Sequence, residues 1–295
     1  MNIFKRTLFV SVVALLLGGC SLVDVAYNNA PYLVGSEFED AFDLSDTQLA
    51  QLDSRLQQFF AWHREEELMQ YREFLDRAAL VSADGITETE FLELQNDVMA
   101  ARDRLLEKAI DSLGDLAVSL TPQQIASFEE YFMENSEKYR DYLEKSEQER
   151  EAYRLDRDLE RLEDWFGDFE SSLELKITAR LTELPDIYPS WIEFREKRHK
   201  TLVSALRDSA GKGIDPQRLK EIMLNPDTDY ARAFEPERQA YWQGYAAALA
   251  DISSWLSDRQ RQRAVTRLQK YASIIDRLSS QEPPETKPAT RQGDR

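Results

Sequence analysis

The chain has 295 residues, and its 55 acidic and 37 basic residues give a net charge of −18. Because nucleic acids bind clustered Lys and Arg, this balance argues against a nucleic-acid partner. The single cysteine excludes an intrachain disulfide and a zinc site built from several thiolates, while 42% apolar residues predict a folded body.

The beginning of the chain predicts an export signal that ends at a modified cysteine. Two basic residues precede an apolar run over 8–17, and Gly18-Gly19 lead into Cys20. The run is shorter than the ~20 apolar residues that span a bilayer, and its order of features is typical of a secretory signal peptide. The segment resembles the bacterial lipobox, which implies removal of residues 1–19 and acylation of Cys20.

The lipobox resemblance also implies a membrane partner that is reached through the lipid anchor. Removal of residues 1–19 takes away two bases and no acid, so the net charge becomes −20. Anionic lipid repels so acidic a body, and attachment must therefore come from the acyl chains on Cys20. Ser21 stands where lipoproteins retained in the inner membrane typically carry Asp. We therefore expect an outer-membrane lipoprotein of a Gram-negative bacterium that faces the periplasm.

The remaining sequence predicts an all-α fold, an elongated antiparallel helical bundle with one or more long helices. Long stretches lack proline, and apolar residues recur in steps of three and four, as at Phe91, Leu94, Val98, Ala101 and Leu105. The expected helices lie near 45–81, 87–118, 122–183, 190–209, 216–224, 236–255 and 257–278.

The expected helix over 122–183 would be about 90 Å long if it were straight. A helix of that length does not suit a compact domain, so we expect a bend or break near Gly167 or Ser171-Ser172.

We divide the chain into five segments. Residues 1–19 are the signal peptide, 20–43 a lipidated tether and docking segment, and 44–210 the main helical bundle. Residues 211–279 form C-terminal helices able to pack on the bundle. The tail over 280–295 is rich in Pro and polar residues and is expected to be disordered.

Four segments predict helix N-termini by the capping-box pattern. In this pattern a Ser or Thr at the N-cap and a Gln or Glu three residues later satisfy each other's free backbone donors. The four are Leu44-Ser45-Asp46-Thr47-Gln48, Ile86-Thr87-Glu88-Thr89-Glu90, Leu120-Thr121-Pro122-Gln123-Gln124 and Leu256-Ser257-Asp258-Arg259-Gln260.

The three boxes with Gln share a longer pattern, in which further apolar residues follow the Leu at offsets of 8 and 12. Here the chain resembles the periplasmic Spy/CpxP-like proteins, whose helical fold carries a repeated Leu-Thr-x-x-Gln motif. The resemblance implies stress-linked chaperoning or signalling. The motif positions are Leu44, Ser45, Gln48, Leu120, Thr121, Gln124 and, with a poorer match, Leu256, Ser257 and Gln260.

A second motif lies in the first predicted helix and comprises Trp62, His63, Arg64, Glu67 and Tyr71. Together with an Asn-Asn-Ala-Pro-Tyr segment upstream, it resembles an uncharacterised family of proteobacterial lipoproteins, a domain of unknown function. That resemblance implies a location in the cell and no activity.

His63 is the best candidate for chemistry, because Glu67 lies one helical turn further on. An imidazole with carboxylates can act as an acid or base, or bind a metal. The other histidine, His199, stands alone, and no His-Glu-x-x-His pattern occurs. We therefore interpret His63 as a packing residue and assign no catalytic, metal-binding or cofactor-binding residue.

These observations favour a lipid-anchored helical protein that binds an unidentified protein partner or client and is not an enzyme. A chaperone-like or envelope-stress role is the first expectation. A structural or assembly role in the cell envelope is the alternative, and an enzyme centred on His63 is the second alternative.

Overall fold

The structure, a computed structural model, describes residues 20–209, 212–224 and 228–281. The predicted signal peptide, 1–19, and the predicted tail from residue 282 onward lie outside the described residues.

Helices account for nearly all of the described chain, and no strand occurs within the described ranges, which confirms the all-α prediction. In chain order the elements are α2 (Cys20–Asn28), α3 (Ala30–Phe42), α4 (Asp46–Trp62), the π-helical turn η2 (His63–Glu67), α5 (Leu68–Asp84), α6 (Glu88–Val118), α7 (Pro122–Asn135), α8 (Glu137–Glu144), α9 (Glu147–Phe166), α10 (Ser171–Thr182), α11 (Tyr188–Asp208), α12 (Pro216–Met223), α13 (Asp229–Trp255) and α14 (Asp258–Ser280).

The capping boxes set the helix starts as predicted. All four form, at the N-termini of α4, α6, α7 and α14, with the hydroxyl accepting from the N3 backbone and the N3 side chain accepting from the N-cap backbone. A fifth box, formed by Ser146 and Glu149, starts α9.

The expected break in the helix predicted over 122–183 is confirmed, but the chain breaks three times there and forms α7, α8, α9 and α10. The first break is at Ser136, whose hydroxyl donates to the Phe132 carbonyl and accepts from Arg195. The second lies before the Ser146 cap. The third is at Gly167, one of the predicted positions, where φ is +86°. Only glycine adopts this backbone conformation without strain.

The prediction that a helix starts at residue 236 is wrong. α13 starts at Asp229, where the Thr228 hydroxyl accepts a hydrogen bond from the Ala231 N–H. Pro236 lies inside the helix. Proline is favoured in the first turn of a helix and disfavoured in the interior, so Pro236 resembles a helix start although α13 continues through it.

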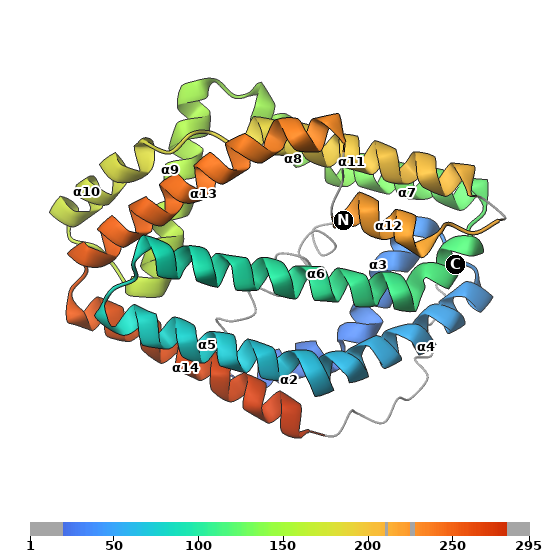
Figure 1. The fold of residues 1–295 in the computed structure, drawn as a ribbon, viewed down its shortest axis with the longest axis horizontal. Helices are drawn as coiled ribbons and strands as arrows, with labels where there is room; N and C mark the ends of the chain where they lie inside the picture. The colour runs from blue at the N-terminus through green and yellow to red at the C-terminus, as the bar shows by residue number, and fades with distance from the viewer. Residues whose placement is uncertain (1–19, 210–211, 225–227, 282–295) are drawn as a thin grey trace, which may run out of the picture.

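The helices form an elongated bundle (Figure 1). α4, η2 and α5 follow one another along one side, where α14 packs against α5. α6 runs through the middle, and α7, α11 and α13 lie along the opposite side. The segment predicted as a tether, 20–43, contains α2 and α3, and α2 packs against α14.

Four apolar clusters hold the helices together. The largest contains Leu52 and Leu56 of α4, Ile125 of α7 and Leu219 of α12, so residues from both sides of the predicted boundary at 210/211 share one core. A second joins α9, α10 and α13, a third joins α5 and α14, and a fourth joins Leu68, Ile274 and α2. Within the described part of the chain, no helix is both long and apolar enough to cross a membrane.

Candidate functional site

The two N-terminal Gln motifs meet in the fold although 76 residues separate them. The side chains of Gln48 and Gln124 are both buried, and each amide group donates to the other's Oε1, at 3.2 and 2.7 Å. Each Oε1 also accepts from the N-cap backbone of its own box, at Ser45 and Thr121. The motif therefore caps two helices and joins them at the same time.

Each glutamine also donates a hydrogen bond to a backbone carbonyl next to the other box. Gln48 Nε2 donates to the carbonyl of Ser119 at 3.0 Å, and Gln124 Nε2 donates to the carbonyl of Asp43 at 3.1 Å. Ser119 lies five residues before Gln124, and Asp43 lies five residues before Gln48. Asp43 adopts the left-handed conformation, with φ at +51°, at the turn between α3 and α4. We call this set of contacts the glutamine clasp.

The leucines of both boxes lie beneath the clasp. Leu44 and Leu120 are buried in the largest apolar cluster together with Leu49 and Ile125, which are the N4 residues of the two boxes. This arrangement matches a hydrophobic staple at each helix start. The third Gln box forms locally: Gln260 is hydrogen-bonded to the backbone N–H and the hydroxyl of Ser257.

The Trp-His-Arg motif occupies η2, the π-helical turn between α4 and α5. Single π-turns within α-helices commonly mark functional positions, because they change which side chains face a neighbour. Here His63 Nδ1 lies 2.8 Å from the hydroxyl of Tyr27 on α2. Burial lowers the His63 pKa to about 4 and raises the Tyr27 pKa to about 12, so an uncharged phenol and an uncharged imidazole share this hydrogen bond.

Arg64 and Glu67 bind other parts of the chain. Arg64 donates to the carbonyl of Leu278 at the end of α14 and to Asn28 Oδ1 at the end of α2, at 2.5 and 2.7 Å. The carboxylate of Glu67, 1% exposed, receives two hydrogen bonds from Arg104 of α6, at 2.7 and 2.9 Å. η2 thus connects α2, α6 and α14.

Trp62 lies at the edge of this network. Its indole N–H donates to Glu66, and Lys108 of α6 lies over its ring at 5.2 Å from the centroid. Tyr71 packs in the cluster with α2 and α14, and burial raises its pKa to about 12. The structure therefore brings the five motif residues together, whereas the glutamine clasp lies at the other end of α4.

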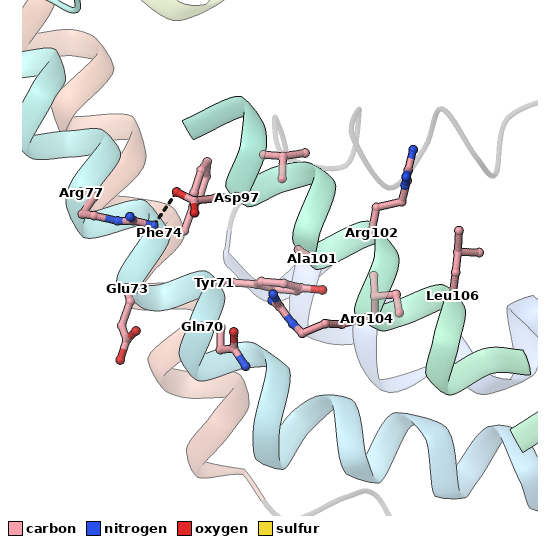
Figure 2. A pocket seen from close by; sticks show the side chains of 12 residues that line it. Gln70, Tyr71, Glu73, Phe74, Arg77, Asp97, Ala101, Arg102, Arg104 and Leu106 are labelled. Atoms are coloured by element: carbon pink, nitrogen blue, oxygen red, sulfur yellow. Dashed lines mark hydrogen bonds and ion pairs between the residues drawn. The ribbon is translucent and has the colours of Figure 1, made fainter. Parts of the chain in front are cut away.

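A groove of about 840 Å³ lies between α5 and α6, next to η2. Its apolar lining comes from Tyr71 and Phe74 on one side and from Val98, Ala101 and Leu105 on the other. Figure 2 shows the two helices separated at this level, with Tyr71 and Arg104 between them.

Two salt bridges connect the helices across the groove. Arg77 of α5 reaches Asp97 of α6 at 2.6 Å, and Arg104 of α6 reaches Glu67 (Figure 2 shows the first pair as a dashed line). Along α6, Val98 and Ala101 of the apolar lining lie between the two bridging residues, Asp97 and Arg104, and Leu105 directly follows the second. Long arginine side chains thus span a gap that shorter residues would not bridge.

Several residues of this site are absent from the sequence-based assignment. Tyr27, Arg104 and the groove itself come from contacts between helices that are distant in sequence. The sequence does contain one indication of the groove, because its wall residues Val98, Ala101 and Leu105 belong to the apolar stripe of α6. Phe91 and Leu94 of that stripe pack against other helices, while the side chain of Val98 is 47% exposed.

His199 lies away from this site. Its ring stacks on Phe132 of α7, with the centroids 3.5 Å apart, and burial lowers its pKa to about 4. Among the described residues no group of three or more His, Cys, Asp or Glu side chains is arranged to hold a metal ion.

Comparison with curated proteins and with solved structures gave no match. The family of unknown function DUF6279 matches residues 40–234. That range includes the glutamine clasp, η2 and both walls of the groove, and it ends within α13. Because the match covers more than half of the chain, this protein belongs to the DUF6279 family.

Proposed function

We propose that the chain is a lipid-anchored protein of the outer membrane, facing the periplasm, whose helical body binds a protein partner and catalyses no reaction. Cys20 is the acylated residue. Its place on α2 supports this proposal, because α2 is attached to the body by Tyr27 and Asn28. An anchor on α2 would hold the whole bundle at the membrane.

The groove between α5 and α6 is the observation that carries the partner-binding proposal. Apolar residues spaced by three and four form the seam of a helix that packs against another helix. On α6 this seam is covered at Phe91 and Leu94 and open at Val98. The occupant we propose is an amphipathic helix of a protein partner, which places apolar residues at i, i+3 or i+4, and i+7 into the groove.

The dimensions of the groove suit such a helix. The open part of the seam, from Val98 to Leu105, is about 10 Å long at 1.5 Å per residue, which is two helical turns. The salt bridges at Arg77 and Arg104 link the two walls in the absence of a partner, so the groove is formed before binding.

The geometry gives less support to an enzyme centred on His63. A general acid or base works best when its pKa lies near the working pH, and the His63 pKa is lowered to about 4. Its Nδ1 is already hydrogen-bonded to Tyr27, and the Glu67 carboxylate is paired with Arg104.

Photo-crosslinking in cells tests the groove. A photo-reactive residue at Leu106, on the groove wall, should give a defined adduct with one envelope protein. Val98→Glu should abolish that adduct, because it places a charge on the open seam. Leu175→Glu is the matched control, since Leu175 is also an exposed apolar residue, 72% exposed, but lies on α10.

Two results would contradict the groove proposal. One is an adduct at Leu106 that persists in the Val98→Glu protein. The other is the same set of adducts when the photo-reactive residue is placed at Leu175.

An aggregation assay distinguishes a chaperone-like role from an assembly role. If the role is chaperone-like, the purified protein should suppress aggregation of unfolded clients, and Val98→Glu should remove this activity. If the role is in assembly, the protein should have one stable partner and should not suppress aggregation.

The anchor has its own test. Inhibition of the lipoprotein signal peptidase by globomycin should accumulate the unprocessed precursor, and Cys20→Ala should release the protein from the membrane fraction. A Cys20→Ala protein that still fractionates entirely with outer membranes would defeat the anchor proposal.

A further inference from the structure

The groove between α5 and α6 has two ends, and each end is marked by a salt bridge. One bridge pairs Glu67 with Arg104, and the other pairs Arg77 with Asp97. Because the residue numbers rise along α5 as they fall along α6, the two helices run in opposite directions. The Arg104 end and the Asp97 end are about 10 Å apart at 1.5 Å per residue of α6.

Hydrogen-bond donors without a partner lie at the Arg104 end. Arg104 binds Glu67 through Nε and Nη2, and its Nη1 makes no hydrogen bond within the described chain. The hydroxyl of Tyr71 has no hydrogen-bond partner among the described residues, and Figure 2 shows it directed from α5 toward α6. The amide of Gln70, the preceding residue on the same wall, is likewise not hydrogen-bonded to any described residue.

The protonation of these groups makes them donors. Burial and the charge of Glu67 raise the Tyr71 pKa to about 12, although Arg104 acts in the opposite direction. The phenol therefore keeps its proton. A guanidinium has five N–H donors and no acceptor, so the free Nη1 of Arg104 can only donate. Hydrogen bonds to half-buried groups such as Tyr71 are strengthened because less water competes for them.

The carboxylates of the two salt bridges differ in exposure. Glu67 is 1% exposed beneath the Arg104 end, so a ligand in the groove meets the arginine and not the acid there. At the other end the Asp97 side chain is 36% exposed, and its Oδ1 has no partner in the described part of the chain. The groove therefore presents free donors at one end and an accessible carboxylate at the other.

An α-helix has the complementary polarity. Its last four carbonyls and its first four N–H groups have no partner within the helix, and its dipole makes the C-terminus negative and the N-terminus positive. A two-turn helix that ends at Arg104 would bring its free carbonyls to the donors and its free N–H groups to Asp97. The reverse orientation would place those carbonyls beside the Asp97 carboxylate, which is unfavourable.

We propose that Gln70, Tyr71 and Arg104 form a binding site for the C-terminus of a helix, so that the partner's helix runs parallel to α6 and ends at Arg104. The inference rests on the proposed partner-binding role of the groove and adds the direction and the end of the bound helix. The ligand needs no net charge, because Glu67 already balances Arg104 and the recognised groups are backbone carbonyls.

Photo-crosslinking from two positions tests the direction of the bound helix. Val98 lies beside Asp97 at one end of the α6 wall, and Leu106 lies at the other end. The full-length chain carries a photo-reactive residue at one of these positions at a time, and mass spectrometry identifies the partner residue in each adduct. The partner residue joined to position 106 should lie C-terminal to the one joined to position 98, by about eight residues.

The order of the two partner residues separates this inference from the groove proposal. The reverse order would overturn the helix C-terminus site and leave the groove as a binding site. The absence of an adduct at both positions would overturn both.

A synthetic peptide with the sequence of the crosslinked partner segment tests the site residues. Its binding to the purified protein, followed by fluorescence anisotropy, should weaken about three- to tenfold in Tyr71→Phe, which removes one donor and keeps the ring. Gln70→Ala, at an exposed position of α5, should weaken binding in the same direction.

Tyr230→Phe is the matched control for the lost hydroxyl. The Tyr230 hydroxyl, on α13, also lacks a hydrogen-bond partner among the described residues, and Tyr230 is not part of the groove lining. This variant should bind the peptide as the unchanged protein does. Equal affinity of Tyr71→Phe, Gln70→Ala and Tyr230→Phe for the peptide would overturn the helix C-terminus site.

Discussion

Gln48 and Gln124 each cap the helix of their own box and are hydrogen-bonded to each other. The same side chain therefore makes a local contact and a contact between distant parts of the chain. A capping residue that acts only within its own box stabilises by about 1 kcal/mol. The amide groups in the clasp also satisfy the carbonyls of Asp43 and Ser119. Loss of either glutamine therefore leaves several polar groups without a partner.

We predict that Gln48→Ala and Gln124→Ala each lower the free energy of unfolding by about 2–4 kcal/mol. The double variant should lose less than the sum, with a coupling energy of about 1–3 kcal/mol, since either substitution already breaks the shared contacts. Urea unfolding measures all three. Gln260→Ala, in the local box of α14, is the control and should cost about 1 kcal/mol and add independently to Gln48→Ala.

His63 gives the stability a pH dependence with a definite sign. Its pKa is about 4 in the folded protein and 6.5 when unperturbed, because burial, with a contribution from Arg64, outweighs the effect of Glu67. The unfolded chain therefore binds the proton more readily than the folded chain. The stabilisation is complete above pH 6.5 and decreases as the pH falls toward 4.

We predict that His63→Gln reduces this decrease in the free energy of unfolding between pH 7 and pH 4 by about 3 kcal/mol. The measurement is urea unfolding of both proteins at several pH values, and their difference cancels the titration of the many carboxylates. Parallel curves for the two proteins would show that His63 does not titrate as proposed.

At the scale of helices, two glycines should respond in opposite directions to the same substitution. Gly167 ends α9 with φ at +86°, and an added Cβ would lie 2.7 Å from the Arg263 guanidinium. Gly114 lies within α6, and its nearest neighbour would be Pro216 at 3.9 Å, an ordinary contact.

We predict that Gly167→Ala lowers the free energy of unfolding by about 1–3 kcal/mol, whereas Gly114→Ala raises it by about 0.5–1 kcal/mol. Thermal and urea unfolding measure both effects. If Gly167→Ala proved neutral, the left-handed break between α9 and α10 would not be needed for the fold.

The helix boundaries show which features of this fold the sequence could predict. The boxes at Ser45, Thr87, Thr121 and Ser257 are local, and each predicted helix start is correct. The break at Ser136 depends on Arg195, which is 59 residues away, and no local pattern indicates it.

The candidate site was predictable only in part, for the same reason. The motif from Trp62 to Tyr71 is visible as a sequence pattern, and its residues do gather in space. Their partners, Tyr27, Arg104 and Leu278, lie on three other helices, and the π-helical turn that directs the side chains toward them has no sequence signature of its own. The pairing of Gln48 with Gln124 likewise depends on the fold as a whole.

At the scale of the whole molecule, the two ends of the described chain meet. α2 lies beside the end of α14, joined by Asp24 with Arg277 and by Asn28 with Gln281. Arg64 holds both ends at once. A flexible tether would leave the stability of the bundle independent of residues 20–28, whereas this arrangement makes α2 part of the folded unit.

We predict that a purified chain beginning at Ala30 has a free energy of unfolding about 3–5 kcal/mol lower than a chain beginning at Ser21. The shorter chain loses the apolar burial of Val23 and Tyr27, and it leaves the buried Arg64 without its Asn28 acceptor. Tyr27→Phe in the longer chain is a graded control: it removes only the hydroxyl that is hydrogen-bonded to His63 and should cost about 1 kcal/mol. Identical urea midpoints for the two chain lengths would restore the tether interpretation of residues 20–28.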